Sequence, residues 1–232
     1  MGTAWGLGVG PGDPELITLK AVRILKAVPV IAYPAPETGD SLARAIAAPH
    51  LPGGQIEIVV RTPMTAERFP AQEVYDRAAT AIGGHLAEGR DVAVLCEGDP
   101  FFYGSFMYLF ARLARSWRVE VVPGVSSLTA CAAAARAPLA ARDDVLSVIP
   151  ATLAEAELVR RLGAADAAAI VKVGRHLAKA RRALAACGLL ADAHYVERAT
   201  MATERVLPLA EAGEDAPYFS MILVHRRRDA WS

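Results

Sequence analysis

The chain has 232 residues, of which 53% are hydrophobic and 22% charged, a composition typical of a globular protein. Its 25 Lys and Arg residues balance 25 Asp and Glu residues, so overall charge does not favour binding to nucleic acid or to an anionic membrane. Charges or prolines interrupt every apolar run before it reaches about 20 residues, and no basic and apolar leader begins the chain. We therefore expect a cytoplasmic protein that binds neither nucleic acid nor membrane.

The cysteines and histidines form no pattern typical of a metal site. Cys96, Cys131 and Cys187 lie far apart in the sequence, and the five histidines include no pair spaced four residues apart. We expect no protein-bound metal.

The first half of the chain alternates predicted strands and helices. An apolar strand at 5–9 ends in a turn at 10–14, where Asp13 followed by Pro14 predicts the start of a helix. Further strands are expected at 30–32, 55–60, 92–96 and 118–122, and helices at 40–48, 73–88 and 106–114. The continuous apolar run 92–96 is typical of a strand buried on both faces of a parallel sheet.

The second half repeats this style after Pro123 and Gly124. Helices are expected at 128–135, 154–162 and 177–186, with strands at 145–149, 168–173, 194–197 and 218–225. The sequence thus predicts an α/β protein of two domains, 1–122 with a mainly parallel sheet and 123–232 with a mixed sheet.

Three loops that follow predicted strands are candidates for ligand binding, because ligands of parallel α/β sheets bind beyond the carboxyl ends of the strands. The first loop is Gly8-Val9-Gly10-Pro11-Gly12-Asp13, and it does not fit a G-x-G-x-x-G dinucleotide motif. The last glycine position of that motif holds Pro11 if the motif starts at Gly6, and Asp13 if it starts at Gly8. The chain also has no Gly-Lys-Ser/Thr element for a nucleoside triphosphate. A plain turn between a strand and a helix remains an alternative for this loop.

The second loop is Glu97-Gly98-Asp99-Pro100-Phe101-Phe102 and the third is Pro123-Gly124-Val125-Ser126-Ser127. Asp99 is suited to accept hydrogen bonds from ribose hydroxyls or an amine, and neighbouring aromatic rings to pack on an adenine ring. A turn with core aromatic residues is the alternative for the second loop, and helix capping by serine is the alternative for the third.

Taken together and in this order, the three loops resemble the motifs of the tetrapyrrole (corrin and porphyrin) methyltransferases. The similarity covers nearly the whole chain. Tyr33-Pro34, 67–70, 98–108 and 217–221 are similar to the branch of the family that methylates C20 of precorrin-2.

The resemblance implies a homodimer whose two α/β domains enclose a cleft for S-adenosyl-L-methionine, the methyl donor, which becomes S-adenosyl-L-homocysteine. By analogy, the donor contacts residues of both predicted domains: Pro11, Gly98, Asp99, Phe102, Ser126, Ser127, Val173, Ala199, Ser220 and Met221. Asp99 is the expected partner of the ribose or the amino acid moiety.

The implied reaction converts precorrin-2 to precorrin-3A in cobalamin (vitamin B12) biosynthesis. The donor is already activated, so alignment and exclusion of water provide much of the expected catalysis. No catalytic residue is assigned, although Glu97 is a weak candidate for accepting a proton. The acidic tetrapyrrole requires local basic groups, for which the candidates are Arg61, Arg68, Arg142, Lys172 and Arg175.

Two alternatives remain open. The first is C20 methylation of the cobalt-containing ring, cobalt-factor II, in the anaerobic pathway. The second is a non-catalytic tetrapyrrole carrier that retains the fold without turnover.

Overall fold

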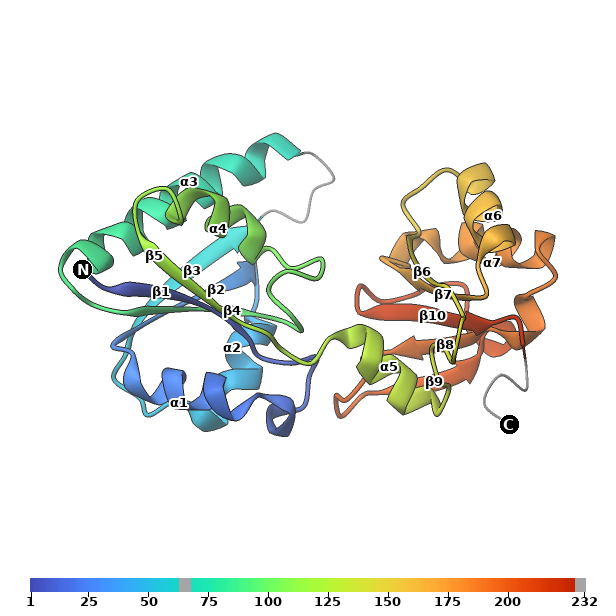
Figure 1. Ribbon diagram of the computed structural model, residues 1–232, viewed down its shortest axis with the longest axis horizontal. Coiled ribbons are helices and arrows are strands. Elements are labelled where there is room, and N and C mark those ends of the chain that lie inside the picture. The colour runs from blue at the N-terminus through green and yellow to red at the C-terminus, as the bar shows by residue number, and fades with distance from the viewer. Residues whose placement is uncertain (63–67, 228–232) are drawn as a thin grey trace. The chain divides into compact units, whose positions relative to one another are not determined.

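The computed structural model describes residues 1–62 and 68–227, and excludes the side chains of 68–71. The chain forms two compact units, 1–126 and 127–232, each containing one five-stranded sheet (Figure 1). The boundary predicted after residue 122 falls at the end of β5 (Arg118–Val122), in the segment that leads to the second unit.

The sheet of the first unit is parallel. Its strands are β1 (Thr3–Gly8), β2 (Val30–Pro36), β3 (Ile56–Thr62), β4 (Val92–Cys96) and β5, in the order β3-β2-β4-β1-β5. All four strand pairs are parallel, and every residue of β4 is buried. Both features agree with the apolar pattern of the sequence.

Helices cover both faces of this sheet (Figure 1). α1 (Leu19–Ala27) and α2 (Leu42–Ala47) pack on one face, where Leu25 and Ile46 join Leu95 in a buried cluster. α3 (Arg68–Ala87) and α4 (Phe106–Leu113) pack on the other, where Ile82 and Phe106 contribute to a second cluster.

A helix begins after Asp13, as predicted, but it is a three-residue 3-10 helix, Pro14–Leu16, and the α-helix starts only at Leu19. Asp13 caps the 3-10 helix by accepting a hydrogen bond from the backbone N–H of Glu15 at 2.8 Å. The chain then runs extended through buried Ile17, and Thr18 caps α1 by accepting from the N–H of Ala21 at 3.2 Å. Two capping residues in succession therefore replace the single start that was predicted.

The sheet of the second unit is mixed. Its strands are β6 (Leu146–Pro150), β7 (Ala167–Val171), β8 (His194–Glu197), β9 (Arg205–Pro208) and β10 (Ser220–His225), in the order β6-β7-β10-β8-β9. β6 and β7 are parallel, whereas β10 is antiparallel to β7 and β8, and β9 is antiparallel to β8. β9, a short strand at the edge, was not predicted.

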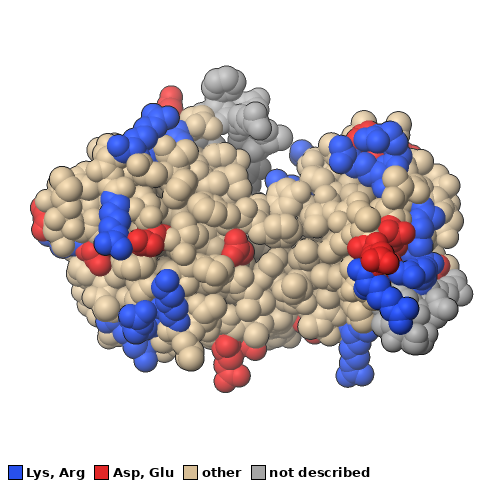
Figure 2. Space-filling view, viewed as in Figure 1, with Lys and Arg blue, Asp and Glu red and all other residues tan. Residues whose placement is uncertain are grey.

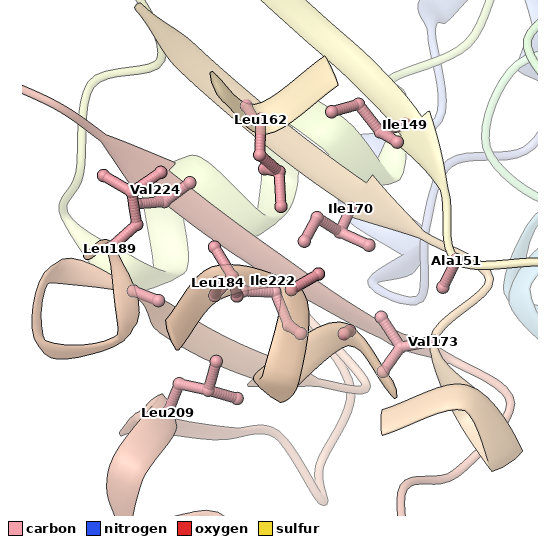
Figure 3. Close-up of a cluster of buried hydrophobic side chains, with 14 of the residues drawn as sticks. Ile149, Ala151, Leu162, Ile170, Val173, Leu184, Leu189, Leu209, Ile222 and Val224 are labelled. Atoms are coloured by element: carbon pink, nitrogen blue, oxygen red, sulfur yellow. The ribbon is translucent and has the colours of Figure 1, made fainter. Parts of the chain in front are cut away.

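Helices also cover both faces of the second sheet (Figure 1). α6 (Glu155–Ala164) and α7 (Leu177–Ala186) cover one face, over a cluster that includes Leu162, Ile170 and Ile222 (Figure 3). α5 (Ser127–Ala135) covers the other, where Ala130 and Cys131 pack with residues of the strands. Burial of these apolar side chains stabilises the unit.

The described surface carries charges of both signs. On the face seen in Figure 2, the Lys and Arg side chains are interspersed with Asp and Glu. Within 1–62 and 68–227, no helix combines the length and apolar character needed to cross a membrane. The same residues contain no cluster of three or more His, Cys, Asp or Glu side chains suited to a metal ion.

Candidate functional site

The loops after β1 and β4 lie at the point of the first sheet where ligands of α/β proteins bind. β1 and β4 are neighbours, but the chain leaves β1 for α1 on one face and leaves β4 for α4 on the other. Such a divergence opens the carboxyl edge of a sheet to a ligand. The sequence placed its first two candidate loops at this position.

Four glycines bring the three candidate loops into direct backbone contact, and we call Gly8, Gly10, Gly98 and Gly124 the glycine junction. The N–H of Gly98 donates to the carbonyl of Gly10 at 2.8 Å, and the N–H of Gly10 donates in return at 3.4 Å. A Cβ atom on Gly8 would lie 2.5 Å from the backbone nitrogen of Gly124, and a Cβ on Gly124 would overlap the carbonyl oxygen of Gly98. Side chains are therefore excluded at Gly8 and Gly124, where the backbones of the three loops approach one another closely.

Asp99 connects the second loop to the third. One carboxylate oxygen accepts a hydrogen bond from the N–H of Phe101 at 2.9 Å, and the other accepts from the N–H of Gly124 at 3.1 Å. A carboxylate has about four acceptor positions, so both oxygens retain capacity for a ligand hydroxyl or ammonium group. Asp99 thus has a structural role that the sequence did not reveal, compatible with the binding role expected for it.

Glu97 places a half-buried acid beside these loops. Burial raises the pKa of its carboxyl group, while hydrogen bonds from its own backbone and from that of Ala43 oppose the rise. Ala43 lies in the first turn of α2, which Ser41 caps. Because a carboxylate with a raised pKa is a stronger base than an ordinary glutamate, Glu97 is chemically suited to accept a proton.

The other donor-site candidates of the first unit lie on the same three loops. Pro11 is buried next to Gly10, and Phe102 is half-buried with its ring 5.2 Å from that of Tyr103 in an edge-on contact. Ser126 immediately precedes α5, which begins at Ser127. The set provides a carboxylate, aromatic surface and backbone amides, which fit the polar and apolar parts of an adenosyl donor.

The four candidates of the second unit lie together at one end of its sheet. Val173 follows β7, Ala199 follows β8, and Ser220 and Met221 begin β10. All four are buried, and the Ser220 hydroxyl donates to the carbonyl of Pro217 at 2.7 Å. Their contribution to a site would come mainly from backbone atoms.

The structure places the basic candidates for tetrapyrrole binding in different parts of the fold. Lys172 and Arg175 are exposed and follow β7, at the same end of the sheet as Val173. Arg142 lies two residues before Asp144, whose carboxylate contacts His225 at the opposite end of β10. Arg61 donates to the backbone carbonyls of Pro36, Glu37 and Gly39, and the side chain of Arg68 lies outside the described part of the chain.

Sequence reasoning missed two features. The contact between Gly8 and Gly124 joins residues far apart in the chain, and its only signal was a glycine at or just after the end of each strand. Arg198, which follows β8, has a φ of 47°, in the left-handed region that arginine seldom adopts. Its residue type gave no signal of that conformation.

The fold and these loops define an α/β protein with a candidate ligand-binding edge on its parallel sheet. The family model of the tetrapyrrole (corrin/porphyrin) methylases matches residues 3–213. The chain belongs to this family.

Three curated relatives are similar to the chain over most of its length. It is 47% identical to a precorrin-2 C(20)-methyltransferase of a Sinorhizobium species, with 99% of this chain and 97% of the relative covered. It is 35% identical to a cobalt-precorrin-2 C(20)-methyltransferase of Salmonella typhimurium, with 97% of each covered. It is 49% identical to the cobalamin biosynthesis protein CobIJ of Mycobacterium tuberculosis, over 96% of this chain, but spans only 46% of that relative.

Solved structures share the fold. The cobalt precorrin-4 methyltransferase CbiF aligns with a TM-score of 0.74 and 24% identity, covering 96% of this chain and 94% of that one. A uroporphyrin-III C-methyltransferase from Thermus thermophilus, complexed with S-adenosylhomocysteine, aligns with a TM-score of 0.70 and 24% identity, covering 97% and 92%. Both support the two-domain α/β fold expected from the sequence.

Proposed function

We propose that this chain is a methyltransferase that transfers the methyl group of S-adenosyl-L-methionine to C20 of precorrin-2, giving precorrin-3A in cobalamin biosynthesis. The observation that carries the proposal is the 47% identity, end to end, to a protein named for this reaction. The glycine junction and Asp99, at the expected edge of the parallel sheet, give the chain the backbone surface and carboxylate that a donor site needs. The complex of a structural neighbour with S-adenosylhomocysteine supports the choice of donor.

In the proposed reaction, C20 attacks the sulfonium methyl group, the new carbon–carbon bond forms as the sulfur–methyl bond breaks, and S-adenosylhomocysteine leaves. The hydrogen at C20 is then lost as a proton. Glu97 is the proposed acceptor because its pKa is raised. In this proposal, backbone atoms of the glycine junction hold the donor in line with the ring carbon that attacks it.

The cobalt-containing ring is the second candidate substrate, since a 35% identical relative is named for it. We favour the metal-free ring because the relative named for precorrin-2 has the higher identity. Dimerisation, which the family resemblance implies, and a cytoplasmic location, which we expect from the sequence, remain proposals.

Parallel assays test the choice of substrate. The enzyme, S-adenosylmethionine and either precorrin-2 or its cobalt form are incubated anaerobically, and initial rates of S-adenosylhomocysteine release are compared. The proposal predicts a higher kcat/KM for precorrin-2, whereas the reverse preference would favour the cobalt-dependent pathway. A carrier would bind the ring without releasing S-adenosylhomocysteine from either mixture.

A further inference from the structure

One end of the second sheet presents two basic residues with an unusual backbone conformation. β10 is antiparallel to both β7 and β8, so the carboxyl ends of β7 and β8 flank its beginning. Lys172 follows β7 with a φ of 57°, and Arg198 follows β8 with a φ of 47°. Residues with a side chain seldom adopt this left-handed backbone conformation, because the Cβ atom is crowded there. Those that do adopt it cluster at functional sites.

The surrounding structure holds Arg198 in this conformation. Its backbone N–H donates to the carbonyl of Phe219 at 2.8 Å. Its guanidinium lies 3.7 Å from the carboxylate of Glu197, which also contacts Arg205 at 3.4 Å and accepts from the hydroxyl of Tyr195 at 2.9 Å. Because two arginines share one buried carboxylate, positive charge remains at the surface, where 41% of the Arg198 side chain is exposed.

Further charges and aromatic surface lie next to this pair. Arg175 adds an exposed basic group beyond Lys172, while the carboxylate of Glu204 is bound to the backbone N–H of Thr200 at 2.6 Å. Tyr218 and Phe219, which precede β10, are 67% and 40% exposed, with ring centroids 5.0 Å apart. Cationic groups beside exposed aromatic rings suit a ligand that is both flat and acidic.

We propose that Lys172 and Arg198 bind the acetate and propionate carboxylates of the tetrapyrrole and so position the ring. This inference rests on the proposed function, since it assigns the groups that recognise the same substrate. The strands that carry the two residues are separated by β10, which puts their backbones about 10 Å apart. That spacing fits carboxylates at several points around a macrocycle better than the single carboxylate of the methyl donor.

The charge of the donor supports the same choice. S-adenosylmethionine carries a sulfonium and an ammonium group against one carboxylate, so a basic surface repels it overall. The tetrapyrrole carries only negative peripheral charges. Lys172 and Arg198 therefore favour the acceptor over the donor.

The test compares Arg198→Ala, Arg198→Lys and Lys172→Ala with Arg136→Ala. Arg136 is a matched control because it is also exposed and left-handed, with a φ of 51°, but it lines a cavity with His194 and His225 at the opposite end of the sheet. With saturating S-adenosylmethionine, we expect each Ala variant at 172 or 198 to raise KM for the tetrapyrrole about 10- to 100-fold, with kcat changed far less. Arg198→Lys should recover part of the loss, and Arg136→Ala should match the wild type.

Binding of uroporphyrin, a stable acidic tetrapyrrole, followed by fluorescence, separates this inference from the proposed reaction. Wild-type protein should bind it more tightly than a porphyrin with fewer carboxylates, and Arg198→Ala should lose that preference even if no methyl transfer occurs. Unchanged KM and uroporphyrin affinity in the Ala variants would overturn the inference. A loss of affinity for S-adenosylmethionine, measured by calorimetry, with tetrapyrrole binding intact would also overturn it, by assigning the pair to the donor.

Discussion

The carboxylate of Asp99 accepts a hydrogen bond from the backbone N–H of Gly124 at 3.1 Å, so that the loop after β4 holds the loop after β5. The same carboxylate caps the turn at Phe101. An aspartate expected from the sequence only to bind a ligand therefore also organises the surface on which the ligand is proposed to lie.

Asp99→Ala should weaken binding of S-adenosylmethionine by about tenfold or more and lower the free energy of unfolding by about 1–3 kcal/mol, because two backbone N–H groups lose a charged acceptor. Calorimetry measures the first effect and urea denaturation the second. Asp166→Ala is the control, since Asp166 accepts from the N–H of Val145 in the second unit at 2.9 Å. Asp166→Ala should lose stability while keeping its affinity for S-adenosylmethionine. If Asp99→Ala binds S-adenosylmethionine as tightly as Asp166→Ala does, Asp99 is not part of the donor site.

Gly124→Ala should destabilise the protein by about 2–3 kcal/mol or prevent its folding, because the new Cβ would overlap the carbonyl oxygen of Gly98. Gly84→Ala in α3 meets no atom within 4 Å and should be neutral or stabilising by up to about 1 kcal/mol. Thermal denaturation compares the two variants. A Gly124→Ala protein as stable as the wild type would show that the glycine junction does not need its close backbone contact.

Glu97→Gln should change how stability depends on pH. In the wild type the folded-state pKa of Glu97 is raised, so its protonated form favours folding, and stability is lost as pH rises from about 4.5 through that raised pKa. Glutamine has no charge to bury, so the stability of the variant relative to the wild type should increase over that range and then level off. Urea midpoints at several pH values measure this, and a constant difference between the proteins would contradict the raised pKa. A simultaneous drop in kcat is expected if Glu97 accepts the proton.

The sequence predicted those features that depend on local patterns. The strands β4 and β8 and the helix α7 begin and end at the predicted residues. In each of them the apolar residues follow a recognisable pattern that ends where the element ends. The mixed sheet of the second unit and the parallel sheet of the first agree with expectation.

The features that escaped prediction depend on contacts between distant residues. β9 is a four-residue edge strand that pairs with β8, and so short a segment offers little local pattern from which to predict it. The contact of Gly8 with Gly124 and the left-handed backbone of Arg198 arise only when separate segments pack together. Neither has a local signature, since the first looks like an ordinary turn and the second is an arginine.

The position of the transferred methyl group tests the central proposal most directly. The protein is incubated anaerobically with precorrin-2 and S-adenosylmethionine carrying a ¹³C-labelled methyl group, and the product is examined by mass spectrometry and ¹³C NMR. We expect one added methyl group, with its carbon bonded to C20. A label bonded to any other ring carbon, or an unmodified ring from protein that binds the donor, would contradict it.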